Sequence, residues 1–130
     1  MKDQSVCGSC WSFGTIGHIE GAYFLKNGGN LVRLSQQALV DCSWGYGNNG
    51  CDGGEDFRAY NWMMHVGGVP TEESYGNYLG QDGYCHVNNV TLVAPITGFV
   101  NVTSNNEAAF KLALFKHGPL SVAVSFYHYP

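Results

Sequence analysis

The chain is poor in charged residues, and in basic residues above all. Of its 130 residues, six are Lys or Arg and ten are Asp or Glu, which gives a formal net charge of −4. Six scattered cations form no basic stripe, so neither nucleic acid nor an anionic membrane surface is expected as a partner. No apolar run approaches the ~20 residues of a membrane span. The opening residues "MKDQSVCGSC" lack the apolar segment of a signal peptide, so any export signal is expected outside this chain.

Repeats and low-complexity segments are also absent, and disorder is excluded by composition. Apolar residues make up 45% of the chain and charged residues 12%, a balance that favours a folded core. The 18 glycines indicate many turns and close backbone approaches. The sequence therefore predicts a loop-rich globular protein.

The chain has five cysteines, an odd number, listed along the sequence as Cys7, Cys10, Cys42, Cys51 and Cys85. Two disulfides and one free thiol would account for them in an oxidising compartment. The glycosylation triplets that begin at Asn89 and Asn101 favour the same compartment. A thioredoxin-like pair of Cys7 and Cys10 would need a buried strand before it, and "MKDQSV" is too short and polar. A zinc site would need a second C-x-x-C or paired histidines, and the other cysteines are too scattered.

Helix and strand patterns divide the chain into two regions. Helices are expected from Cys10 to near Lys26, from the N-cap Ser35 to Cys42, and over "EDFRAYNWMMHV" before Gly67. Residues 43–54 are expected to form a loop and residues 69–93 to be irregular. After Pro95 the pattern predicts a strand over "ITGFVNVT", a capped amphipathic helix over "NNEAAFKLALFKHG" and a buried strand over "PLSVAVSF". A boundary near residues 90–95 separates the two regions.

Cys10 is a candidate nucleophile because it stands at the predicted start of a helix. A thiol attacks as its thiolate, and the unpaired N–H groups of a first helical turn favour negative charge. Gln4, six residues earlier, could offer a side-chain N–H to a developing oxyanion beside the backbone N–H of Cys10. These residues alone leave a structural cysteine without chemistry as the alternative.

The segment "CGSCW" resembles the signature of papain-like, cathepsin L-like cysteine proteases. The similarity continues through "QSVCGSCWSFG", "LSQQALVDC", "NNGCDGG", "GVPTEESY" and "HGPLSVAV". The resemblance implies an α+β papain-like fold, with a helical first domain at residues 1–93 and a β-rich second domain, incomplete here, at 94–130. It also implies Cys10 as the nucleophile, Gln4 as the oxyanion-hole donor, and disulfides Cys7–Cys51 and Cys42–Cys85.

The same resemblance implies how a peptide substrate is bound. Gly8, Gly53 and Gly54 are expected to line the cleft and to pair with an extended peptide. Glu55 and Asp56 stand where the family usually presents apolar side chains to the second residue before the cut. They predict either a solvated helix N-terminus or a pocket that accepts basic residues. No cofactor or metal is implied. The implied partners are peptide or protein substrates, inhibitors or a propeptide, in a lysosomal or extracellular setting.

A cysteine protease also needs an imidazole and a side chain that orients it. His18 would lie about 12 Å along the helix from Cys10, at ~1.5 Å per residue, which is too far for it to serve as the base. The remaining candidates are predicted at helix ends, in a loop, or outside the family's catalytic context: His65, His117, His86 and His128. The family's histidine and asparagine belong to the second domain. The sequence therefore predicts a partial copy that is inactive alone, and a non-catalytic peptide-binding or decoy homologue is the alternative function.

Overall fold

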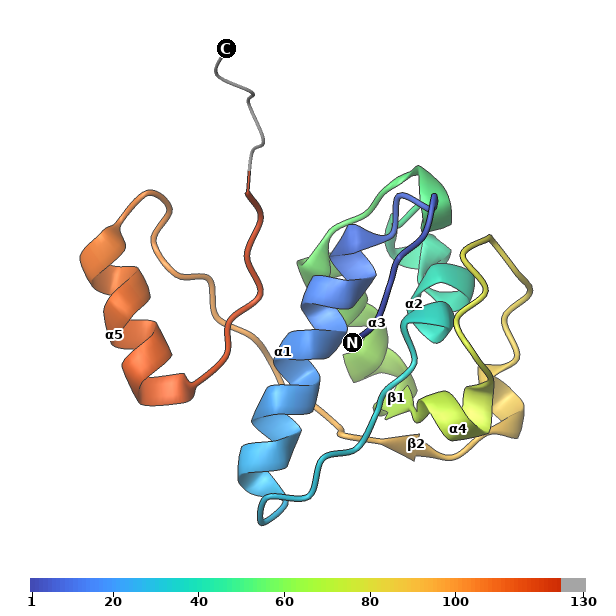
Figure 1. Cartoon of the computed structure of the whole chain (residues 1–130), viewed down its shortest axis with the longest axis horizontal. Helices are drawn as coiled ribbons and strands as arrows, with labels where there is room; N and C mark the ends of the chain where they lie inside the picture. The colour runs from blue at the N-terminus through green and yellow to red at the C-terminus, as the bar shows by residue number, and fades with distance from the viewer. Residues whose placement is uncertain (125–130) are drawn as a thin grey trace.

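The structure, a computed structural model, describes residues 1–124, and helices dominate it (Figure 1). The α-helices are α1 (Cys10–Lys26), α2 (Gln36–Cys42), α3 (Asp56–Val66), α4 (Glu72–Tyr75) and α5 (Glu107–His117). Short 3₁₀ helices are η1 (Trp44–Tyr46), η2 (Gly50–Asp52) and η3 (Val87–Asn89). Two short strands, β1 (Val69–Pro70) and β2 (Leu92–Val93), form an antiparallel pair. A helix-rich chain with a small sheet agrees with the predicted α+β class.

Helix α1 is the central element because α2 and α3 both pack against it. Its predicted span is confirmed at both ends. Ile16 is fully buried and Ile19 is nearly so, whereas Phe24, expected on the buried face, is 37% exposed. Another side of α1 carries the helix's own glycines. Segment 119–121 lies against two of them, Gly14 and Gly21. The helix is therefore covered on two sides by segments distant in sequence.

The predicted ends of the other long helices are confirmed by their capping contacts. The Ser35 hydroxyl accepts a hydrogen bond from the N–H of Ala38 at 3.0 Å and starts α2. Gly67 ends α3 in the left-handed region, with φ of 91°. The Asn106 side chain accepts from the N–H of Ala109 at 2.9 Å and starts α5.

The prediction that residues 69–93 are irregular is wrong in part. Val69 pairs with Val93 and Pro70 with Leu92, which joins the two ends of this segment. Thr71 caps α4 by accepting from the N–H of Ser74. These elements are short and depend on partners far along the chain, so the local pattern did not reveal them.

Both strands predicted after Pro95 are absent from the described residues. Residues 96–103 and 119–124 have no strand, and the last part of "PLSVAVSF" and His128 lie outside residues 1–124. A strand is completed only by hydrogen bonds to a neighbour, and within residues 1–124 neither segment has one. Ile96 and Phe99 instead pack against the core without joining a sheet. The domain boundary near residue 93 stays a prediction.

Helix α5 stands apart from the bundle formed by α1, α2 and α3 (Figure 1). None of its residues is buried, and Phe110, Leu112 and Phe115 are 37%, 53% and 89% exposed. The helix agrees with the sequence prediction, and its apolar side chains are left exposed. Among the described residues, none of the helices combines the length and the apolar character needed to cross a membrane.

Candidate active site

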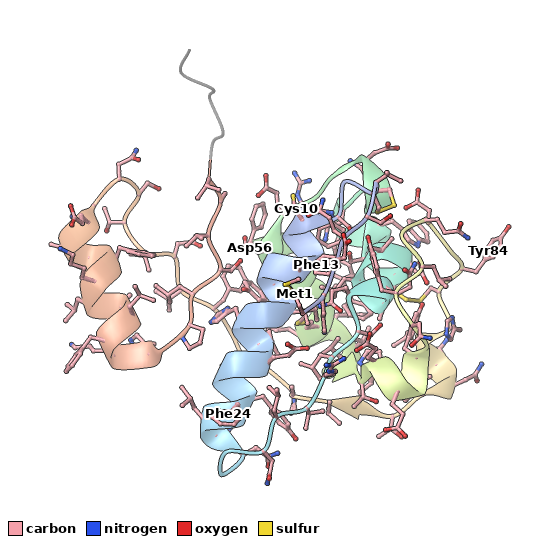
Figure 2. The ribbon with its side chains drawn as sticks, viewed as in Figure 1. Met1, Cys10, Phe13, Phe24, Asp56 and Tyr84 are labelled. Carbon is pink, nitrogen blue, oxygen red and sulfur yellow. A yellow bond between two sulfur atoms is a disulfide. The ribbon has the colours of Figure 1, made fainter. Side chains whose placement is uncertain are left out.

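Cys10 is the first residue of α1, and its thiol is free and exposed. The other four cysteines are joined as Cys7–Cys51 and Cys42–Cys85, the pairing that the resemblance implies. Figure 2 shows Cys10 at one end of α1, at the surface of the molecule. Ser9 precedes it as the N-cap residue, yet its side chain accepts no hydrogen bond from the helix. The positive end of α1 is therefore left open beside the thiol.

The segment before Cys10 is fastened to the glycine-rich loop at residues 50–54. A disulfide joins Cys7 to Cys51, and the N–H of Gly8 donates to the carbonyl of Cys51 at 2.9 Å. The N–H of Cys51 in turn donates to Asp82 at 2.8 Å. These bonds hold the candidate nucleophile beside the loop that was predicted to bind substrate.

Gly53 and Gly54 of that loop are required for different reasons. Gly53 has φ of 115°, a left-handed value that favours glycine, and a side chain there would meet no atom within 4 Å. Gly54 faces inward instead, because a Cβ at that position would lie 2.7 Å from Trp11 and 2.6 Å from Asn48. Gly53 thus leaves an open face, whereas Gly54 allows close packing beneath it.

Trp11 and Asn48 support the loop from below. The Trp11 indole N–H donates to the carbonyl of Gly50 at 3.1 Å. The Asn48 carboxamide oxygen accepts from the N–H of Glu55 at 2.8 Å, and its NH₂ donates to Ser43 at 2.9 Å. Sequence reasoning did not assign either residue to the site, although "CGSCW" and "NNGC" contain them.

Glu55 and Asp56 follow the loop and begin α3. Glu55 is exposed and Asp56 is half-buried. Within residues 1–124 the ion pairs are Lys2–Glu20 and Lys111–Glu107, so neither carboxylate is paired with a described cation. Arg58, the nearby cation, donates to the carbonyl of Gly47 at 2.7 Å instead. The loop therefore ends in two carboxylates that form no ion pair with a described cation.

The Gln4 side chain is held close to the nucleophile's segment. Its Nε2 donates to the carbonyl of Cys7 at 3.0 Å. An amide NH₂ group has two N–H bonds, so the second remains for another acceptor. The structure thus places Gln4 in the same short segment as Cys10 with one donor bound internally.

Each histidine in the described part of the chain has contacts or a position that indicate a role other than catalytic base for Cys10. The Nδ1 of His18 lies 2.7 Å from the Tyr60 hydroxyl, between α1 and α3. Burial lowers the pKa of His18, and the charge of Asp56 offsets this only in part. His65 lies beside the ring of Tyr46, and His117 is the last residue of α5.

His86 is engaged by backbone carbonyls in the loop around Cys85. Its Nε2 lies 2.9 Å from the carbonyl of Tyr75, and its Nδ1 lies 3.1 Å from that of Tyr84. A carbonyl only accepts hydrogen bonds, so both contacts are made at once only by the protonated ring. These two contacts raise the pKa of His86, with that of Tyr75 first. This histidine therefore fastens a loop.

The described residues offer no metal site. Within residues 1–124, no three side chains of His, Cys, Asp or Glu gather closely enough to hold an ion. A hollow of about 560 Å³ is bordered by Leu31, Arg33, Glu72 and Asn77, and Cys10 is not among its lining residues. The candidate site is therefore defined by the exposed thiol and its loop rather than by an enclosed pocket.

Comparison with known proteins links this geometry to a family. Residues 1–129 match the papain family of cysteine proteases. The chain is 48% identical to cathepsin L of Sarcophaga peregrina over 128 residues, which cover 98% of this chain and 37% of the relative. It is 48% identical to digestive cysteine proteinase 1 of Homarus americanus over 129 residues, covering 98% of this chain and 39% of the relative.

Solved structures show the same likeness. Bromelain protease from Ananas comosus, solved in complex with the inhibitor E64, aligns with a TM-score of 0.81 and 36% identity. That alignment covers 89% of this chain and 52% of bromelain. Procathepsin L 3 from the larval midgut of Tenebrio molitor aligns with a TM-score of 0.79 and 37% identity, covering 88% of this chain and 37% of the other. The chain spans between 37% and 39% of the length of the two curated relatives.

Proposed function

The chain belongs to the papain family of cysteine proteases, and from this we propose that the whole protein is a cysteine-type peptidase with Cys10 as its nucleophile. The observation that carries the proposal is the state of Cys10. It is the cysteine left free by the two disulfides, it is exposed, and it begins α1. A thiolate is favoured at this end of a helix.

In the proposed reaction, the Cys10 thiolate attacks the carbonyl carbon of the scissile peptide bond. The second N–H of the Gln4 amide and the backbone N–H of Cys10 would stabilise the oxyanion. The C–N bond then breaks and leaves a thioester on Sγ, which water hydrolyses to free the thiol. An imidazole must protonate the leaving amine. We place this histidine, with its asparagine, in the part of the whole protein that corresponds to the unmatched length of the relatives.

The loop at residues 50–54 is proposed to bind the peptide. The open face at Gly53 leaves room for an extended substrate to approach the backbone, and Gly8 and Gly54 fix the loop beside Cys10. The proposed partners are peptides, protein substrates, inhibitors and a propeptide. The two disulfides and the exposed triplets at Asn89 and Asn101 support glycosylation and a lysosomal or extracellular location.

The proposal is tested on the complete product of the transcript, whatever its length. We expect it to hydrolyse peptidyl substrates and to take up one molecule of E-64 on Cys10, located by mass mapping. The 130 residues alone are expected to react far more slowly than the complete product, because no described histidine stabilises the thiolate. If the complete product binds peptides without cleaving them, and its transcript encodes no further histidine, the protein is a peptide-binding or decoy homologue.

Glu55 and Asp56 predict a preference for a basic residue two positions before the cut. The charge contrast favours arginine over leucine there, and we expect the variant E55Q/D56N to lose about fivefold in kcat/KM for the arginine substrate, with the leucine substrate unchanged. The variant E72Q/E73Q removes the same charge from α4 and is the matched control. A strong leucine preference in the unaltered protein would show that the two acids only begin α3.

A further inference from the structure

We propose that Tyr78 is a positioning residue that holds the Ser9 hydroxyl away from the N-terminus of α1 and ties it to the backbone of Gln4. The inference rests on the proposed role of Cys10 and adds a residue from a distant loop to that site. Tyr78 lies in the segment after α4, more than sixty residues beyond Cys10 in the sequence. Nothing in its local sequence marks it as part of the site.

The directions of the hydrogen bonds at Tyr78 follow from its chemistry. Its hydroxyl oxygen lies 2.9 Å from the carbonyl of Gln4, and a carbonyl can only accept. The single proton of Tyr78 is therefore given to Gln4. The Ser9 hydroxyl lies 2.6 Å from the same Tyr78 oxygen, so in this bond Ser9 donates and Tyr78 accepts. The three residues form a directed chain from Ser9 through Tyr78 to Gln4.

This series of hydrogen bonds explains why the Ser9 side chain does not cap the N-terminus of α1. Serine at an N-cap ordinarily accepts a hydrogen bond from an N–H of the first helical turn. The Ser9 side chain makes no such bond, and its backbone, at φ −102° and ψ 21°, lies outside the extended region usual for a cap. Ser9 is completely buried, so its hydroxyl depends on protein partners and not on water. Tyr78 supplies that partner.

The Tyr78 ring is itself held in place from two sides. It meets the ring of Phe13 on α1 edge to face, with centroids 5.0 Å apart. The next residue, Leu79, donates its N–H to the buried side chain of Gln37 on α2 at 2.9 Å. The phenol is thus fixed relative to α1 and α2.

The consequence concerns the charge at Cys10. A helix N-terminus favours an anion through its free N–H groups, and a capping hydroxyl would occupy one of them. The N–H groups of Ser12 and Phe13 already donate to the Ser9 carbonyl. Because Tyr78 holds the Ser9 hydroxyl away, the N–H groups of Cys10 and Trp11, which have no acceptor among the described residues, remain available to the thiolate. The same contact fixes the backbone of Gln4, whose side chain is the proposed oxyanion donor.

The test compares Tyr78→Phe with Tyr84→Phe in this 130-residue chain. Phenylalanine keeps the contact with Phe13 and removes only the hydroxyl. Tyr84 is 95% exposed, so it serves as a matched control. Alkylation of Cys10 by iodoacetamide is followed at pH 6 and at pH 10. We expect Y78F to react about two- to fivefold more slowly at pH 6 and at an unchanged rate at pH 10, where nearly every thiol is ionised. Y84F is expected to match the unaltered chain at both values.

A double variant separates this role from a general loss of structure. Ser9→Ala removes the hydroxyl that would cap α1 when the Tyr78 hydroxyl is absent. The double variant S9A/Y78F is therefore expected to regain the pH 6 rate of the unaltered chain. Three results would overturn the proposal. Y78F could be alkylated at pH 6 as fast as Y84F, or its alkylation could be slowed equally at pH 6 and pH 10. The third is that S9A fails to restore the pH 6 rate of Y78F. These comparisons need no peptide hydrolysis, so a failure of the proposed peptidase activity would be seen separately.

Discussion

We expect the replacement of Cys10 with alanine to abolish the proposed peptide hydrolysis by the complete product of the transcript, with kcat/KM lower by a factor of at least about 10⁴. The proposed thioester cannot form without the sulfur of Cys10. Among the described residues the remaining cysteines are all in disulfides. Initial rates with a fluorogenic peptide give the measurement.

We expect this substitution to leave the fold unchanged, so that the loss of activity can be attributed to the missing thiol. Cys10 is exposed and free, so Cys10→Ala is expected to alter the free energy of unfolding by less than about 0.5 kcal/mol. Thermal unfolding followed by circular dichroism checks this. Hydrolysis that survives in a folded C10A variant would show that another group is the nucleophile.

Breaking either disulfide lowers the free energy of unfolding by about 4 kcal/mol, because each closes a long loop in the unfolded chain. The sequence separations are 44 residues for Cys7–Cys51 and 43 for Cys42–Cys85, so the entropic effects are nearly equal. The double variants C7S/C51S and C42S/C85S are measured by urea unfolding of this chain. If only one of the two double variants had a lower free energy of unfolding, this result would contradict the loop-closure explanation.

The two disulfides are expected to differ in their effect on the site. Cys7–Cys51 joins the nucleophile's segment to the substrate loop, whereas Cys42–Cys85 fastens the end of α2 to the loop that carries His86. C7S/C51S should therefore raise KM for peptides in the complete product when assayed where it remains folded, and C42S/C85S should not. Equal KM values in the two variants would show that the Gly8 hydrogen bond to Cys51 suffices to hold the loop.

The helices were predictable because their signals are local. Ser35 caps α2, Asn106 caps α5 and Gly67 ends α3, and each acts within one turn of its own position. The two strands predicted after Pro95 are absent from residues 1–124 for the opposite reason. Alternation of apolar residues is compatible with a strand, but a strand forms only when another segment supplies hydrogen bonds. The pairing of Val69 with Val93 was missed because its partner lies far along the chain.

The sequence by itself determined the four longest helices, the odd cysteine, and the motif that made Cys10 a candidate nucleophile. Tertiary structure alone decided what surrounds that thiol. Packing places Trp11 and Asn48 beneath Gly54, leaves Glu55 and Asp56 unpaired with a described cation, and brings Tyr78 to Ser9 and Gln4. The reason is physical: helix propensity and capping act between neighbours in sequence, whereas hydrogen bonds and packing depend on distances that exist only after distant segments have met.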